Sequence, residues 1–271
     1  MKQTFRQRMR LQSNWWYLLV LPLWVYGAFL LANLFLGFIA GAFTSFGADL
    51  SAVNPVLLAT TGAAIAYILS MLLVVAVPWW LWRRRTTAKE LGVTSLPSWW
   101  DILITPLAYV IYLVFTAILL MVATKFLPVN LEQPQALPFT QSMLGAQWQY
   151  VLAFLTLVVM APIAEELLFR GYLYGKLRTF APVWISVLVA SIAFGLAHVW
   201  TGGTDAPLQW AVAIDTFALS LVMCLAREYT GAIWVPMLMH MAKNGLAFYL
   251  LFINPTFIDQ LKQAAVLLIG G

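Results

Sequence analysis

Charged side chains are scarce in this sequence of 271 residues. Asp, Glu, Lys and Arg together make up 9% of it, whereas soluble domains average about 25%. Hydrophobic residues make up 63%. A chain this poor in charge and this rich in apolar side chains would be hard to keep in solution, so the composition excludes an ordinary soluble domain and indicates a polytopic membrane protein.

Cysteine is almost absent as well. The single Cys224 excludes an intramolecular disulfide framework, and its apolar neighbours predict that it packs as a small hydrophobic residue. The net charge is +5, but the basic residues cluster at the ends of apolar runs instead of lining one face. This distribution argues against a nucleic-acid partner and is typical of residues that set membrane topology.

Seven apolar runs are long enough to be considered as membrane spans, each of which needs about 20 residues. They cover approximately residues 15–42, 55–82, 102–124, 149–172, 182–200, 208–226 and 231–253. The first is too long for a signal-peptide core and predicts a retained anchor, whereas 264–269 is too short to cross and is expected in the interface. The sequence therefore predicts an all-α transmembrane helix bundle of seven to eight spans.

No repeat of fixed period and no sizeable soluble domain is present. We divide the chain into a two-span region with its cytoplasmic link (1–101), a membrane core (102–253) and a tail (254–271). In a seven-span arrangement most basic residues fall on one side, namely those of the leader, Arg83, Arg84, Arg85, Lys89, Lys176, Arg178 and Arg227. The positive-inside rule then predicts a multi-pass cell-membrane protein with a cytoplasmic amino terminus.

The apolar run at 149–172 contains two adjacent carboxylates and an arginine. Glu165, Glu166 and Arg170 are flanked by Leu, Val, Phe and Met for more than a helical turn on both sides. An ionised group in hydrocarbon costs several kcal/mol, so such residues usually face a bundle interior or a water-filled cavity and serve function. These residues are the first candidates for chemistry.

Two further spans carry polar residues four positions apart, and hence on one helical face. Phe194 and His198 lie in the fifth span, and His240 and Asn244 lie in the seventh. The chain has only these two histidines. Counting about 1.5 Å per residue from the nearest turns places both histidines, Asn244 and Glu165 at depths where they could meet near mid-membrane.

Taken in order, Glu-Glu-x-x-x-Arg, Phe-x-x-x-His and His-x-x-x-Asn resemble the motifs of the CPBP intramembrane protease family, which includes type II CAAX prenyl proteases and bacteriocin-processing or immunity proteins. EELLFRGYLYGKL and TGAIWVPMLMHMAKNG are similar to the family around these motifs too. The resemblance covers roughly residues 102–253, and the first two spans are not diagnostic.

The resemblance implies a hydrolytic site, with Glu165 as the base that activates water and His198 holding the same water. His240 and Asn244 are implied as donors to the oxyanion. For Glu166 and Arg170, the i, i+4 spacing favours a pair that orients the helix, and Phe194 is expected to pack beneath the site.

Each of these residues also has a structural alternative. The two glutamates could form an ion pair with Arg170, the histidines could hydrogen-bond across helices, and Asn244 could join two helices. Asp215 is expected to pair with a neighbour or line the cavity, and Lys243 is a candidate for that neighbour; neither is assigned a catalytic role.

The sequence leaves metal dependence open. Glu165, His198 and His240 form a two-histidine, one-carboxylate set, which is common at catalytic zinc, but there is no H-E-x-x-H helix. We favour a metal-free mechanism with glutamate-activated water and no cofactor. The predicted function is an intramembrane endopeptidase that acts on membrane-associated, prenylated or leader peptides in the lipid bilayer. The alternative is a non-proteolytic membrane protein, either a transporter or an immunity or scaffold protein with a vestigial site.

Overall fold

The structure is a computed structural model that describes residues 15–127, 129–131, 137–199, 208–257 and 260. These residues form helices and connecting segments, with no strand among them. The principal helices are α2 (Tyr17–Ser45), α3 (Pro55–Trp82), α5 (Trp99–Ala123), α9 (Val183–Ala197), α10 (Trp210–Thr230) and α11 (Trp234–Phe248), together with the continuous helix that spans Gln147–Leu177. The predicted all-α bundle is confirmed.

Every predicted span contains a helix, but the helices differ in length. Within the described ranges, five are long and apolar enough to cross a membrane: α2, α3, α5, the helix at Gln147–Leu177 and α10. The fifth predicted span forms α9, which is apolar but only 15 residues long. The predicted span at 182–200 is therefore longer than its helix, and His198 lies just beyond the helix end as its C-cap.

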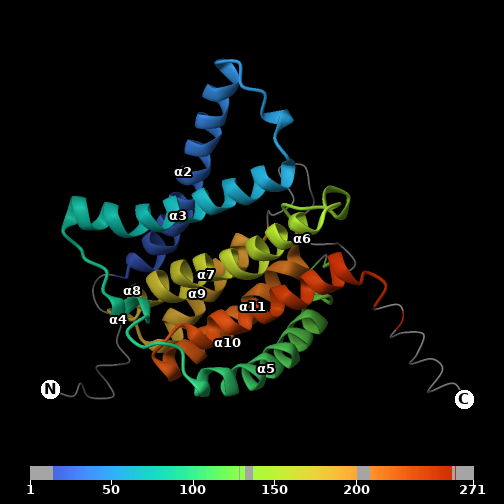
Figure 1. The fold of residues 1–271 in the computed structure, drawn as a ribbon. Coiled ribbons are helices and arrows are strands. Elements are labelled where there is room, and N and C mark those ends of the chain that lie inside the picture. The colour runs from blue at the N-terminus through green and yellow to red at the C-terminus, as the bar shows by residue number, and fades with distance from the viewer. Residues whose placement is uncertain (1–14, 128, 132–136, 200–207, 258–259, 261–271) are drawn as a thin grey trace, which may run out of the picture.

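The helix at Gln147–Leu177, called the central helix below, comprises α6 (Gln147–Phe154), η3 (Leu155–Met160), α7 (Ala161–Glu166), η4 (Leu167–Leu173) and α8 (Tyr174–Leu177). Figure 1 shows it in the middle of the molecule, with α2 and α3 on one side and α9, α10 and α11 on the other. Helix α5 packs against α10 and α11. Helices therefore pack on two sides of the central helix, which gives its polar residues an interior to face.

Local signals in the sequence define the ends of α3. The Asn54 side chain accepts hydrogen bonds from the backbone N–H groups of Val56 and Leu57, and Pro55 occupies the first turn, where a missing N–H costs nothing. At the other end, Arg83 has a left-handed backbone (φ 56°), which stops the helix ahead of the remaining arginines. Both ends of α3, which packs beside the central helix, are thus defined by local sequence signals.

The short helix α4 (Ala88–Leu91) fastens the link after α3 to the end of the central helix. Lys176 Nζ lies 2.9 Å from Glu90 Oε2, and Gly175 approaches the Glu90 carbonyl so closely that a Cβ would collide with it. Burial raises the pKa of Glu90, but hydrogen bonds from Thr87 and Lys176 outweigh it and hold the pKa below its usual range. The predicted link is therefore an ordered part of the bundle.

The basic leader lies outside the described residues, but the other basic residues predicted on one side of the membrane do gather at one end of the bundle, where Lys176 Nζ also donates to the Arg85 carbonyl. Arg178 pairs with Glu228 (Nε–Oε2, 3.0 Å), and Arg227 Nη2 donates to the carbonyls of Lys89 and Glu90. Which face of the membrane this end occupies stays a prediction of the positive-inside rule.

Candidate active site

Glu165 lies on α7, within reach of three other helices. Tyr67 of α3 donates a hydrogen bond to Glu165 Oε1 at 3.0 Å. The second oxygen, Oε2, is buried, has no hydrogen-bond partner among the described residues, and faces the histidines. The carboxylate is thus held by one oxygen and presents the other to the site.

Both histidines present Nε2 to that second oxygen. The distances to Glu165 Oε2 are 4.0 Å from His198 and 3.9 Å from His240. These separations exceed hydrogen-bond length, so neither ring hydrogen-bonds this carboxylate oxygen directly. The predicted meeting of Glu165, His198 and His240 within the bundle is found in the structure.

The orientation of each ring is set through its other nitrogen. His198 Nδ1 is 2.8 Å from the Phe194 carbonyl, and because a carbonyl only accepts, the ring must donate there. His240 Nδ1 lies 2.8 Å from Glu166 Oε1, which likewise accepts. In a neutral ring of this kind Nε2 is the acceptor nitrogen, and it carries a hydrogen only when the ring is protonated.

Glu166 and Arg170 form the predicted i, i+4 pair, with 3.0 Å between Arg170 Nη1 and Glu166 Oε1 and both side chains fully buried. The Arg170 guanidinium also stacks over the Phe194 ring at 4.1 Å, so Phe194 packs beneath the site as expected. The contact from Glu166 to His240 was not predicted. Glu166 therefore links the ion pair to the site by orienting one of its histidines.

Asn244 lies one turn beyond His240 on α11, and its side chain hydrogen-bonds a backbone carbonyl of the central helix. Its Nδ2 donates to the Leu157 carbonyl at 2.8 Å, eight residues before Glu165 on the central helix. The sequence predicted that all four polar residues meet, because their depths in the membrane are similar. Depth alone, however, does not say which neighbour each side chain contacts.

Tyr67 is the residue that sequence reasoning missed. It belongs to α3, in the region that carries no family motif, and nothing in its spacing marks it out. Its hydroxyl is one of several in this largely apolar span, beside those of Thr60, Thr61 and Ser70. Its role becomes visible through the contact of α3 with α7.

The expected partnership of Asp215 and Lys243 is found as well. Lys243 Nζ lies 2.9 Å from Asp215 Oδ2, and the hydroxyls of Tyr112 and Thr116 donate to Asp215 Oδ1 at 2.6 and 3.0 Å. This second polar cluster joins α5, α10 and α11.

The spacing of the site atoms bears on whether they could bind a metal. Ligand atoms about 2.0–2.1 Å from a tetrahedral zinc lie about 3.3 Å apart, whereas the distances here are 3.9 and 4.0 Å. As arranged, the described residues include no group of three or more His, Cys, Asp or Glu side chains that could hold a metal ion. The donor types suit zinc, but their present geometry does not fit it.

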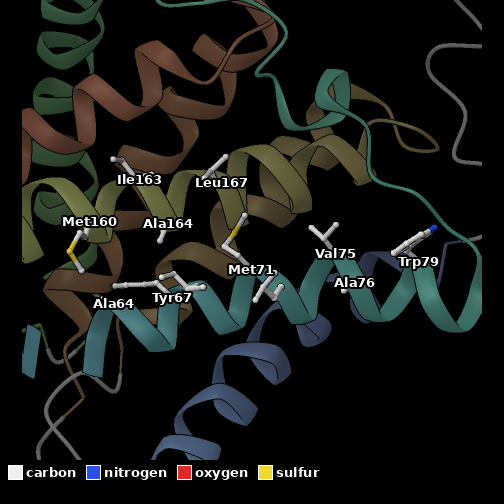
Figure 2. Close-up of a pocket in the computed structure, with 12 residues that line it drawn as sticks. Ala64, Tyr67, Met71, Val75, Ala76, Trp79, Met160, Ile163, Ala164 and Leu167 are labelled. Atoms are coloured by element: carbon white, nitrogen blue, oxygen red, sulfur yellow. The ribbon is translucent and has the colours of Figure 1, made fainter. Parts of the chain in front are cut away.

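An apolar groove of about 740 Å³ runs between α3 and the central helix. Figure 2 shows its lining residues on these two helices, with Tyr67 close to Ala164. Its other wall residues, which extend as far as Trp79, are hydrophobic. Since the Tyr67 hydroxyl bonds Glu165, the groove adjoins the site.

Comparison with protein families gives an independent view of this arrangement. Residues 147–246 match the family described as type II CAAX prenyl endopeptidase Rce1-like. This segment is therefore similar to the Rce1-like family. It contains every residue that the sequence motifs singled out, from Glu165 to Asn244, and it lies inside the predicted core. The resemblance drawn from the motifs is thereby confirmed.

Two curated relatives are similar to the chain over part of its length. The "Putative membrane peptidase YdiL" of Bacillus subtilis (strain 168) is 25% identical over 134 residues, which are 49% of this chain and 51% of that protein. An "Uncharacterized 24.3 kDa protein" of Escherichia coli is 30% identical over 98 residues, 35% of this chain and 42% of that protein. The chain thus spans about half the length of these relatives or less. No solved structure matches it.

Proposed function

We propose that this protein is an intramembrane endopeptidase in which Glu165 activates water. The observation that carries the proposal is the convergence of Glu165 Oε2 and the two histidine Nε2 atoms, 3.9–4.0 Å from the carboxylate oxygen, within apolar helices. Three acceptor atoms that face one another need a shared proton or cation between them. A water molecule together with one protonated ring would meet this need and would supply the nucleophile.

The contacts divide the roles between the two histidines. His198 donates through Nδ1 to a backbone carbonyl, which leaves Nε2 as an acceptor that can hold the water. His240 donates through Nδ1 to a carboxylate, Glu166, which fixes the ring with Nε2 toward Glu165. Protonated His240 then directs an Nε2–H group into the site, where it can donate to the oxyanion.

Hydrolysis would then proceed in two steps. Glu165 takes a proton from the water as the oxygen attacks the peptide carbonyl carbon, and the carbonyl oxygen becomes an oxyanion facing His240. Collapse of this intermediate breaks the C–N bond, and the proton held by Glu165 passes to the leaving amine. We route no step through a metal ion, because the present spacing does not suit one.

The substrate class is proposed from the groove. An extended peptide in a groove whose walls are apolar would leave its backbone N–H and C=O groups unpaired, at a cost of several kcal/mol each. A hydrocarbon chain has no such groups. We therefore favour a membrane-associated peptide that carries a long hydrocarbon chain, as in the prenylated substrates of the family's description, with the peptide bond at Glu165 and the chain in the groove.

The decisive test uses purified protein in proteoliposomes with a library of membrane-associated peptides. Wild type should release cleavage products and Glu165→Gln should not. Chelators should leave the rate unchanged, and elemental analysis should find no stoichiometric metal. Zinc at one equivalent, lost on chelation together with activity, would replace the glutamate-only mechanism. Solute or ion flux without cleavage would instead make the protein a carrier.

The groove assignment has a separate test with a matched control. Ala76 lines the groove, whereas Ile65 is exposed on α3 and does not line it. Ala76→Phe should raise KM for a lipid-modified peptide and leave kcat/KM for the unmodified peptide unchanged, and Ile65→Phe should change neither. Equal effects on both peptides would remove the hydrocarbon chain from the groove.

A further inference from the structure

A polar pocket lies at the basic end of the bundle, away from the apolar groove. It has a volume of about 290 Å³, several times the roughly 30 Å³ that one water molecule occupies. It lies between α4, the end of the central helix and the end of α10, and Figure 1 shows α4 and α8 side by side there. Its charged lining residues are the cations Lys89, Arg178 and Arg227 and the carboxylates Glu90 and Glu228.

Both carboxylates of this pocket are already neutralised. Glu228 accepts hydrogen bonds from Arg178 through both oxygens, Oε2 from Nε and Oε1 from Nη2, each at 3.0 Å. The Tyr174 hydroxyl donates to Glu228 Oε2 at 2.8 Å. Glu90 pairs with Lys176, whose Nζ is 2.9 Å from Oε2. Neither carboxylate is therefore left to balance another cation of the pocket.

The positive charges of Arg227 and Lys89 remain uncompensated. Arg227 is only 7% exposed, and its Nη2 donates to the carbonyls of Lys89 and Glu90 at 3.2 Å. Its Nε is buried without a hydrogen-bond partner, and its Nη1 bonds none of the described residues. The Lys89 ammonium likewise has no ion-pair partner in the described part of the chain. Buried charged donors are normally paired, so this pocket lacks an anion.

The backbone of the link after α3 makes room for the guanidinium. Gly92 ends α4 with a left-handed conformation (φ 74°), and a Cβ at this position would lie 2.5 Å from Arg227 Cζ. The carbonyl of Gly92 accepts from the Ile233 N–H at 3.2 Å, which ties the link to the start of α11. The turn and the guanidinium therefore both require glycine here, and together they fix Arg227 in the pocket wall.

The depth of the pocket matches the level of lipid headgroups. Gly175, which lines it, follows Glu165 by ten residues on the central helix. At about 1.5 Å per residue this is about 15 Å, or half of the roughly 30 Å hydrocarbon core. With Glu165 near mid-membrane, the pocket lies where hydrocarbon gives way to headgroups. The exposed Trp80 and Trp82 at the end of α3 agree, because tryptophan is enriched at that boundary.

We propose that this pocket binds a phosphate group, supplied by the headgroup of an anionic phospholipid, with Arg227 and Lys89 as its ligands. The oxygens of a phosphate suit the N–H groups of a guanidinium, and basic pockets between membrane helices bind such headgroups. The bound lipid would join α4, α10 and the end of the central helix, and so stabilise the helix that carries Glu165. The proposal does not depend on the hydrolytic function.

A lipid titration of the purified protein in neutral detergent tests the proposal. In about 0.5 M salt the Debye length is only ~4 Å, so distant surface charges contribute little. Phosphatidylglycerol should raise the melting temperature of wild type by several degrees, because a ligand of the folded state stabilises it. Phosphatidylcholine, whose phosphate is balanced by its own cation, should not. Lys89→Gln should raise the phosphatidylglycerol concentration for the half-maximal effect at least about tenfold, as expected for a lost charge-assisted hydrogen bond.

Arg85→Gln is the matched control, because it removes the same charge from the same end of the bundle but Arg85 does not line the pocket. It should change the half-maximal concentration by less than about twofold. Lys89 is exposed, so its variant remains informative even where Arg227→Gln fails to fold. Equal weakening in Lys89→Gln and Arg85→Gln, or no response of wild type, would overturn the proposal. If inorganic phosphate alone gives the rise and Lys89→Gln removes it, the ligand is a soluble phosphate and the lipid assignment is wrong.

Discussion

Two polar clusters lie within the apolar helices of this protein, and they differ in how their charges meet. In the cluster of Asp215 and Lys243, the oppositely charged atoms are in direct contact at 2.9 Å, and Tyr112 and Thr116 donate to the remaining carboxylate oxygen. In the cluster around Glu165, the nearest histidine nitrogens stay 3.9 and 4.0 Å from Oε2.

Burial does not distinguish these clusters. The side chains of Asp215 and Lys243 are 22% and 17% exposed, and those of Glu165 and His198 are 19% and 15% exposed. What differs is whether the charged atoms are paired. A structural polar group in a core pairs directly, whereas a catalytic group must keep an atom available for substrate or water. The comparison teaches that spacing, more than burial, distinguishes the cluster proposed to be catalytic from the cluster around Asp215.

The largest effect should come from removing the unsatisfied carboxylate. We expect Glu165→Gln and His198→Ala each to abolish hydrolysis, with losses of at least about 10³-fold, because proton transfer and water binding fail. Both proteins should remain folded in the membrane, as judged by melting temperature and gel filtration in detergent. Turnover near the wild-type rate in either variant would remove that residue from the mechanism.

The next largest effect should follow from breaking the buried pair that supports the site. Arg170→Ala leaves Glu166 uncompensated in a fully buried position, and such a loss typically costs about 3–5 kcal/mol. We expect low expression and a lower melting temperature for Arg170→Ala and Glu166→Gln, with activity lost in proportion to the folded fraction. A stable Glu166→Gln protein without activity would instead place Glu166 in the chemistry, through its contact with His240.

Substitutions in the Asp215 cluster should affect stability and spare catalysis. Asp215→Asn and Lys243→Met each strand one partner of the pair, so both should lower the melting temperature. Turnover per folded molecule should stay within about threefold of wild type, and the double variant should be more stable than either single one, because no unpaired charge remains. A selective loss of kcat in a stable Lys243→Met protein would erase the distinction between the clusters.

The smallest effect should belong to Tyr67→Phe, which removes one hydrogen bond to Glu165 and keeps the ring. A net contribution of about 0.5–1.5 kcal/mol corresponds to a fall in kcat of about two- to tenfold. Steady-state kinetics on the same peptide would measure it, with the melting temperature as the control. No change in kcat would show that the Glu165 carboxylate is oriented without this hydroxyl.

Much of the fold could be predicted from the order of apolar and polar residues along the sequence. Apolar run length gave the helices, because hydrocarbon thickness and the helical rise fix how many residues a span needs. The apolar run at 55–82 coincides with α3, whose start is capped by Asn54. The end of α9 was placed too late, since apolar residues continue beyond Ala197 although the helix does not. Composition alone does not record where backbone hydrogen bonding stops.

For the candidate site, the sequence by itself determined which polar side chains are available for chemistry. The cost of burying charge singled out Glu165, Glu166 and Arg170, and the four-residue spacing placed His240 and Asn244 on one face of their helix. These inferences needed only local geometry and the polarity of each side chain, both of which the sequence contains.

Only the tertiary structure decided which partner each polar group selected. Tyr67 reaches Glu165 because α3 packs beside α7, and Asn244 bonds the Leu157 carbonyl because α11 packs beside η3 of the central helix. Such choices depend on the rotation and depth of one helix against another. Helix packing sets both through many small contacts spread over the whole bundle, so no single stretch of sequence specifies them.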